Sequence, residues 1–168
     1  MPVLAGYSFL FWILLMQTIS VWNSTNNYCN QLAKNFQPFL KYEKVFILDA
    51  PAYYNGLAAF RSALEERIYF EFGSPLEKIN FISGSYHESS ADSLVSIKVT
   101  DGSLVVKGPA DRKQYFSIKG AWAKSYETDE YKVAFDSTGY SYTLTFKKEI
   151  PPNSVFIYAS GDNWKKVN

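Results

Sequence analysis

The chain has 168 residues, a length that suggests one domain with an appendage. Its 17 basic and 16 acidic side chains nearly cancel, which argues against a nucleic-acid partner. The single cysteine, Cys29, excludes an intrachain disulfide. The single histidine, His87, stands without a Cys/His cluster, so we expect no metal site and no cofactor.

The charges are unevenly distributed along the chain. Residues 1–33 carry none, and every charged side chain lies at or beyond Lys34. The segment from Pro2 to Trp22 is an uncharged run of about 20 residues, the length that matches a bilayer core of roughly 30 Å. This pattern predicts a transmembrane helix with Tyr7 and Trp22 as interfacial aromatic residues, and therefore the lipid bilayer as a partner.

Two other interpretations of this segment stay open, a cleaved signal peptide and a helix buried in a soluble protein. A signal peptide normally begins with basic residues, and none precedes the apolar run here. The missing charged flank fits the last span of a longer polytopic protein, whose other transmembrane helices would then be partners. We expect the rest of the chain on the extracytoplasmic side, although Lys34, Lys41 and Lys44 favour the cytoplasmic side.

The pattern changes after the apolar run. Apolar residues at near-helical spacing predict a helical extension over 27–40, which Pro38 should end. A short buried strand is expected over 45–48, ended by 49–51, followed by a helix over 57–70.

From residue 79 onward the period of the apolar residues is close to two, typical of strands. Asp101-Gly102 predicts a hairpin turn. A first strand is expected to begin at Ile79, and a last short strand is expected near Trp164. The strands expected between them cover residues 94–100, 104–107, 115–122, 131–135, 140–147 and 155–159.

These elements predict an α+β fold with two parts. Residues 1–40 would form the transmembrane helix with its extension, and residues 41–168 an extramembrane domain. That domain would contain one β-loop-α unit and a mainly antiparallel sheet of about six to eight strands.

Three residues are weak candidates for ligand binding. Asp49 follows a buried strand and precedes a helix, where α/β folds often bind ligands, but it would repel an anion and also fits a simple turn residue. Arg61 could clamp a phosphate or carboxylate, or pair with Glu65 on the helix surface. Tyr54 belongs to a set of aromatic residues that could stack on a sugar, or could pack in a β-rich core.

No residues in the sequence form a recognisable catalytic set. His87 stands in a serine-containing segment without an identifiable acid partner, and Glu65-Glu66 is typical of a solvated helix face. We therefore predict no catalytic residue in this chain and leave open whether a parent protein is an enzyme.

Three parts of the chain together resemble a known group of proteins. They are the apolar N-terminal helix, the stretch VFILDAPAYYNGLAAFRSAL from Val45 to Leu64, and the closing segment from Val155 to Val167. Together they resemble the C-terminal region of bacterial multi-pass membrane proteins related to GT-C type glycosyltransferases. The chain departs from that pattern at Asp49, where Asn is usual, and at Ser62-Ala63, where Asn-Gly is usual.

The resemblance implies a tail domain that is accessory to lipid-linked sugar transfer and inactive alone, with a glycan or a lipid-linked sugar as a possible partner. The alternative is an exported or singly anchored β-rich binding protein, and a stand-alone enzyme is a third hypothesis.

Overall fold

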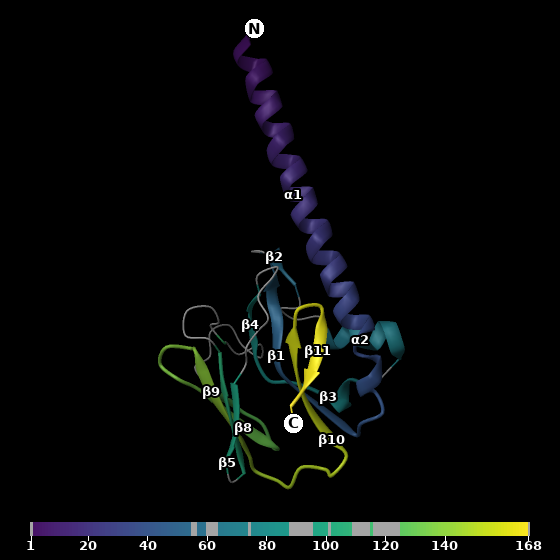
Figure 1. Cartoon of the computed structure of the whole chain (residues 1–168), viewed down its shortest axis with the longest axis vertical. Helices are drawn as coiled ribbons and strands as arrows, with labels where there is room; N and C mark the ends of the chain where they lie inside the picture. Colours follow the sequence, from purple (N-terminus) through teal and green to yellow (C-terminus); the bar gives the residue numbers. More distant parts are fainter. Residues whose placement is uncertain are drawn as a thin grey trace.

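The computed structural model describes residues 2–54, 57–59, 64–73, 75–87, 96–100, 102–108, 115 and 125–167. A long N-terminal helix, α1 (Pro2–Lys34), rises from a domain that contains two sheets, of six and five strands (Figure 1). The chain is therefore α+β, with its N-terminus at the far end of the projecting helix.

The first sheet is built around the 11-residue strand β1 (Lys44–Tyr54). This strand pairs in parallel with three others, namely β3 (Ile79–Phe81), β4 (Gly84–His87) and β10 (Ser154–Ser160). Two short strands complete the sheet with antiparallel pairs, β2 (Leu57–Ala58) beside β1 and β11 (Asn163–Lys166) beside β10. Residues 45–52 are all buried, as expected for a strand covered on both faces.

The second sheet is antiparallel throughout. Its strand order is β5 (Ser96–Thr100), β6 (Ser103–Lys107), β9 (Ser141–Phe146), β8 (Tyr131–Phe135) and β7 (Ser125–Glu127). Buried and exposed residues alternate along β8, which fits one face on the core and one in solvent. Gly102 has a φ of 69° in the β5–β6 turn, a backbone conformation that favours glycine.

Side-chain alternation along β1 divides the core into two clusters. Val45 and Ile47 belong to a cluster on the helical side of the first sheet, whereas Phe46 and Leu48 belong to a cluster shared with the second sheet. Successive side chains of a strand point to opposite faces, so β1 contributes to both. The domain therefore has helices on one face of the first sheet and the second sheet on the other.

The C-terminal third of α1 is part of this core. Leu32 and Phe36 are completely buried, and the Trp164 indole Nε1 donates a hydrogen bond of 2.8 Å to the Leu32 carbonyl oxygen. The Trp164 ring also meets the Phe36 ring edge-on, with 5.9 Å between centroids. A second helix, α2 (Leu64–Phe72), buries Leu64 and Ile68 in the same cluster. The helix α1 is thus fixed to the last hairpin of the chain.

Helix α2 and the connections are short. Gly73, with a φ of 63°, follows α2, and its N–H donates to the Tyr69 carbonyl oxygen at 2.7 Å, an arrangement that ends helices. Two 3₁₀ helices, η1 (Gln37–Phe39) and η2 (Leu76–Lys78), lead into β1 and β3.

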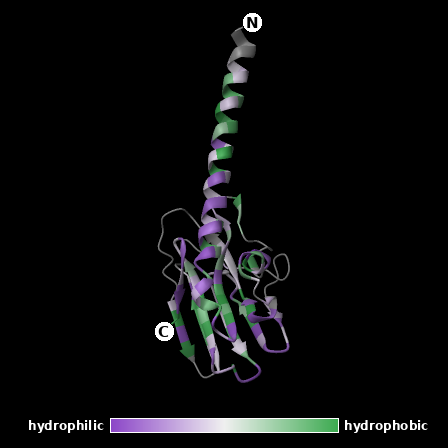
Figure 2. Cartoon of the chain, turned by 90° about the vertical axis from the view of Figure 1, so that its right-hand side faces the viewer, coloured by the Kyte–Doolittle hydropathy of each residue, from purple (hydrophilic) through white to green (hydrophobic). Residues whose placement is uncertain are grey.

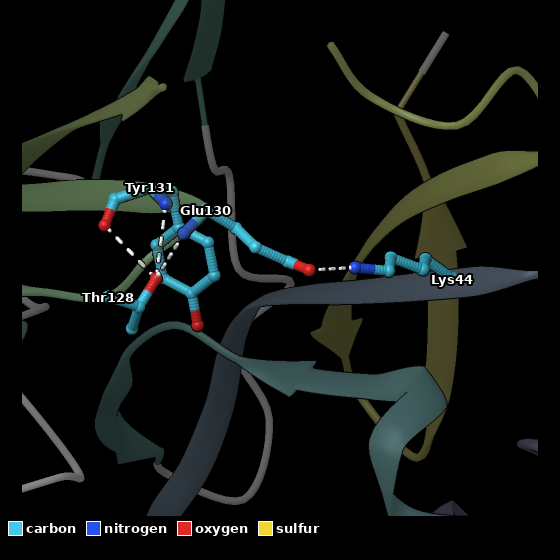
Figure 3. A network of polar contacts seen from close by, with 4 residues as sticks. All are labelled: Lys44, Thr128, Glu130 and Tyr131. Atoms are coloured by element: carbon cyan, nitrogen blue, oxygen red, sulfur yellow. Dashed lines mark hydrogen bonds and ion pairs between the residues drawn. The ribbon is translucent and has the colours of Figure 1, made fainter. Parts of the chain in front are cut away.

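A polar network joins the two sheets at the start of β1 (Figure 3). The Lys44 ammonium group forms an ion pair with the Glu130 carboxylate, just before β8. The Thr128 hydroxyl accepts hydrogen bonds from the backbone N–H groups of Glu130 and Tyr131, at 3.3 and 3.1 Å, and so fixes the turn that carries Glu130. Because both charged side chains are partly exposed, the ion pair contributes little to stability by itself.

The predicted transmembrane helix is wrong. Within the part of the chain that the structure describes, no helix combines the length and the hydropathy needed to cross a membrane. Gln17 and Asn23 interrupt the apolar sequence of α1, and from Thr25 onward its buried side chains face the protein core. The extension predicted over residues 27–40 is helical only to Lys34, followed by η1.

The predicted β domain also needs correction. The structure has two sheets, of six and five strands, instead of the single sheet of six to eight strands that was predicted. The prediction of a mainly antiparallel sheet also fails for the first sheet, because β1 pairs in parallel with β3, β4 and β10. The strand expected to end at residues 49–51 continues to Tyr54, because Pro51 lies next to an irregularity in the β1–β4 pairing that accommodates it. Residues 57 and 58 form β2 instead of the start of a helix, and most of the strand predicted over 115–122 lies outside the described residues.

Shortening the buried side chain that fixes α1 should destabilise the whole domain. We expect Leu32→Ala to lower the free energy of unfolding by about 2–5 kcal/mol, because it leaves a cavity in the buried cluster to which Leu32 and Trp164 belong. Gln31→Ala, at the exposed neighbouring position, should change it by less than about 0.5 kcal/mol. Chemical denaturation measures both values, and equal effects would contradict the packing described here.

Candidate functional site

The most unusual surface of the molecule is the free part of α1, residues 6–22. Its large apolar side chains are exposed, including Tyr7 at 71% and Trp22 at 62%. Hydrophobic residues recur around this part of the helix, and hydrophilic ones become frequent towards the domain (Figure 2). The other exposed large hydrophobic residues of the segment are Phe9, Leu10, Phe11, Trp12, Ile13, Leu14, Met16, Ile19 and Val21. A contiguous apolar surface of this kind marks a site of interaction.

The polar side chains near this surface are partly satisfied by the helix itself. The Thr18 hydroxyl donates to the Leu14 carbonyl oxygen at 2.9 Å, and the Thr25 hydroxyl donates to the Val21 carbonyl oxygen at 3.0 Å. Hydroxyls bonded in this way do not need water as an acceptor. Thr18, the one threonine in the free part of α1, is therefore compatible with apolar surroundings.

A cleft of about 660 Å³ opens where the free part of α1 meets the domain. It lies between α1, the β2 segment and α2, and Trp22 marks its upper boundary on α1. The other lining residues are Thr25, Asn26, Cys29, Leu57, Ala58, Ala59, Glu66, Arg67, Phe70 and Glu71. Its size is in the range of small-molecule sites, and it combines apolar walls with a few polar groups.

The polar groups of this cleft come mainly from one face of α2. Arg67 is half-buried, whereas Glu66 and Glu71 are exposed. Phe70 is 82% exposed and lines the same cleft. Residues three or four apart share a helix face, which explains why Arg67, Phe70 and Glu71 are gathered here while Leu64 and Ile68 face the core.

The structure places Asp49 inside β1 and not at a strand end. Its side chain is completely buried, and the Ser85 hydroxyl on β4 donates a hydrogen bond of 2.6 Å to its carboxylate. It follows an irregularity in the pairing of β1 with β10. Asp49 therefore belongs to the core and does not open to a ligand crevice.

Several tyrosines lie close to this buried carboxylate. Burial, followed by the charge of Asp49, raises the pKa of Tyr28 and of Tyr115 above the ordinary range. Burial also raises the pKa of Tyr142, whose hydroxyl donates to the Leu48 carbonyl oxygen at 2.5 Å. Burial thus favours the protonated form of all three phenols, and among them the Tyr142 hydroxyl has a hydrogen-bond acceptor.

The other predicted site residues are scattered. The Tyr54 ring stacks on the Tyr28 ring, with 3.9 Å between centroids and 9° between planes, so this half-buried ring packs β1 against α1. Arg61 lies outside the described residues. Of the four candidates that the structure describes, Trp22 alone lines the cleft.

Sequence reasoning missed the residues that shape this cleft from α2. Arg67, Phe70 and Glu71 belong to the stripe beside the buried stripe of Leu64 and Ile68. Helical periodicity could have grouped them, but it could not show that α1 passes opposite.

A second hollow, of about 460 Å³, lies at the other end of the domain and has mostly apolar walls, among them Val99, Phe146, Phe156 and Val167. Among the described residues no group of three or more His, Cys, Asp or Glu side chains is placed to hold a metal ion. No family model, curated protein or solved structure matches the chain.

The buried carboxylate should matter for stability through its hydrogen bond. Asp49→Ala leaves the Ser85 hydroxyl without this acceptor in the core, and we expect a loss of about 1–3 kcal/mol in the free energy of unfolding. Asp49→Asn keeps an oxygen that accepts the bond and should cost less. Equal losses for the two variants, measured by denaturant titration, would contradict this role.

Cys29 should react slowly in the folded protein. Burial raises the pKa of its thiol to about 11 from an ordinary value of 9.0, against a smaller opposite effect of Arg67. The thiolate is the reactive form, so at pH 8 the native protein should be alkylated by iodoacetamide roughly a hundredfold more slowly than the unfolded chain. The ratio of the two alkylation rates measures this, and a ratio near one would show that the α1–α2 junction is open.

Proposed function

We propose that the chain is a membrane-attached domain whose free helix segment, residues 6–22 of α1, is immersed in lipid. The observation that carries the proposal is the contrast between the two parts of one continuous helix. One part is fixed in the protein core through Cys29 and Leu32, and the other exposes uncharged apolar side chains in all directions. The proposal concerns immersion in lipid and not a crossing of the membrane.

Energetics favours this location. Removing one large aliphatic or aromatic side chain from water contributes about 1.5–3 kcal/mol, and the segment exposes many of them. No charged side chain on residues 6–22 opposes the transfer. The α-helix pairs its own backbone groups, so they do not need water either.

The mode of attachment differs from that of an amphipathic helix lying flat on a membrane. Such a helix has a charged face on one side, which residues 6–22 lack. The buried contacts of Leu32 and Trp164 also hold α1 so that it projects from the domain (Figure 1). Lipid around the projecting segment would place the α1–α2 cleft near the head groups.

Three expectations from the sequence lie beyond this proposal and stay predictions. They are the extracytoplasmic side, the other transmembrane helices of a parent protein, and an accessory role in lipid-linked sugar transfer. The last rests only on the resemblance carried by residues 45–64, the preceding apolar helix and residues 155–167. An exported or singly anchored binding protein also stays a prediction, and its surface would include the apolar hollow around Val99.

A charge placed in the free segment should detach the protein from membranes. We expect Leu10→Asp to reduce the fraction of full-length protein that floats with phosphatidylcholine vesicles, with a roughly hundredfold weaker partition coefficient. An aspartate at the centre of a helix in lipid costs about 2.5–3.5 kcal/mol, and each 1.4 kcal/mol is tenfold.

Gln31→Asp is the matched control, because it places the same charge at an exposed position on the part of α1 that packs on the domain. It should float like the unchanged protein. If the unchanged protein does not float and instead forms concentration-dependent dimers in sedimentation, a second copy covers the free segment and the lipid proposal is wrong.

A further inference from the structure

We propose that the cleft between α1, β2 and α2 binds the head group of a zwitterionic phospholipid. This inference rests on the proposed immersion of residues 6–22 in lipid, since that immersion brings the cleft to the level of the head groups. Three features of the cleft support this ligand, namely its charges, its aromatic side chains and its position next to Trp22.

The charges of the cleft select the type of head group. Arg67 offers a planar donor that suits a phosphate group, whereas Glu66 and Glu71 offer negative charges that suit an ammonium group, with or without N–H donors. A purely anionic head group would be repelled by the two carboxylates, and a purely cationic one by the guanidinium group. A head group with both charges, a phosphate next to an amine, satisfies both kinds of side chain.

The spacing on α2 also fits this ligand. Arg67 and Glu71 are four residues apart on one face, so their side chains start about one helical turn from each other. Asn26 on α1 adds an amide that can donate or accept a hydrogen bond at the same cleft. The phosphate and the amine of one head group can thus reach different side chains of the same site.

Two exposed aromatic residues complete the cleft. Trp22 and Phe70 are 62% and 82% exposed, and both line it. Aromatic faces attract alkylammonium groups through cation–π interactions. Leu57 and Ala58 add apolar wall, which suits the glycerol end of a lipid better than a free phosphate compound in water.

The position of the cleft favours a lipid over a soluble metabolite. Trp22 is the last large apolar residue of the free segment, and the cleft continues along α1 through Thr25, Asn26 and Cys29. A lipid whose acyl chains lie beside residues 6–22 would present its head group at this depth.

The test is flotation of the full-length protein with two kinds of vesicle of the same acyl chains, one of phosphatidylcholine and one of phosphatidylglycerol. We expect at least fivefold tighter binding to phosphatidylcholine. Glu71→Gln should remove most of this preference, because it removes a carboxylate that attracts choline and repels an anionic head group. Arg67→Gln should weaken binding to both kinds of vesicle, because both lipids carry the phosphate, and Lys98→Gln, exposed on the second sheet, should change neither. Equal binding to both vesicles, a preference that survives Glu71→Gln, or unchanged binding of Arg67→Gln would overturn the proposal.

A second measurement does not depend on the folding of any variant. In nanodiscs of phosphatidylcholine, we expect nuclear Overhauser effects between the choline methyl protons and the rings of Trp22 and Phe70. If lipid protons instead show nuclear Overhauser effects only with residues of the free segment, and none connects choline with Trp22 and Phe70, the head-group site is wrong. Failure to bind either vesicle would instead overturn the immersion of α1, so the two proposals fail in different ways.

Discussion

The packing of α1 on the first sheet is the constraint on which the rest of the structure depends. Leu32, Phe36 and Trp164 form its centre, and the indole hydrogen bond ties the helix to the last hairpin. Because α1 is continuous to Lys34, this packing also fixes the direction of its free segment. Folding the free segment back over the domain would require breaking the helix, and so its apolar side chains stay exposed.

The strand β1 connects this constraint to the other sheet. Its alternate side chains enter the helical cluster and the cluster between the sheets, so both depend on one strand. Asp49 lies in this strand with Ser85 and the phenols of Tyr115 and Tyr142 nearby. Buried polar groups of this kind cost free energy unless they are paired, and they favour one register over a shifted one. The buried carboxylate thus helps to specify the fold and is remote from the surface that we propose as functional.

The sequence predicted local features of the fold better than its long-range pairings. The strand over 45–48 and the hairpin at Gly102 follow from apolar runs and turn chemistry, and the structure has both. The parallel pairing of β1 with β10 joins segments more than one hundred residues apart, and no local signal marks it. The sequence predicts that residues 49–51 end this strand, although an irregular pairing lets Pro51 stay inside it.

The candidate site shows the same division between local and long-range information. The uncharged segment is visible in the sequence, but the conclusion that its helix crosses a membrane was wrong, and the interfacial role of Tyr7 and Trp22 stays a prediction. Asp49 and Tyr54 looked available for a ligand because burial depends on what packs from elsewhere in the chain. The cleft arises from α1, β2 and α2 together, so only the folded arrangement could bring Trp22 and Arg67 to one place.

The most direct test of the central claim compares two positions on the same helix. Spin labels attached at Leu14→Cys and Gln31→Cys, with Cys29 replaced by alanine, report contact with oxygen in lipid and with a nickel complex in water. With phosphatidylcholine vesicles, we expect oxygen to relax the label at position 14 far more than the nickel complex does. At position 31 we expect the nickel complex to relax the label more than oxygen does. A label at 14 that the nickel complex relaxes as strongly as the label at 31 would contradict it.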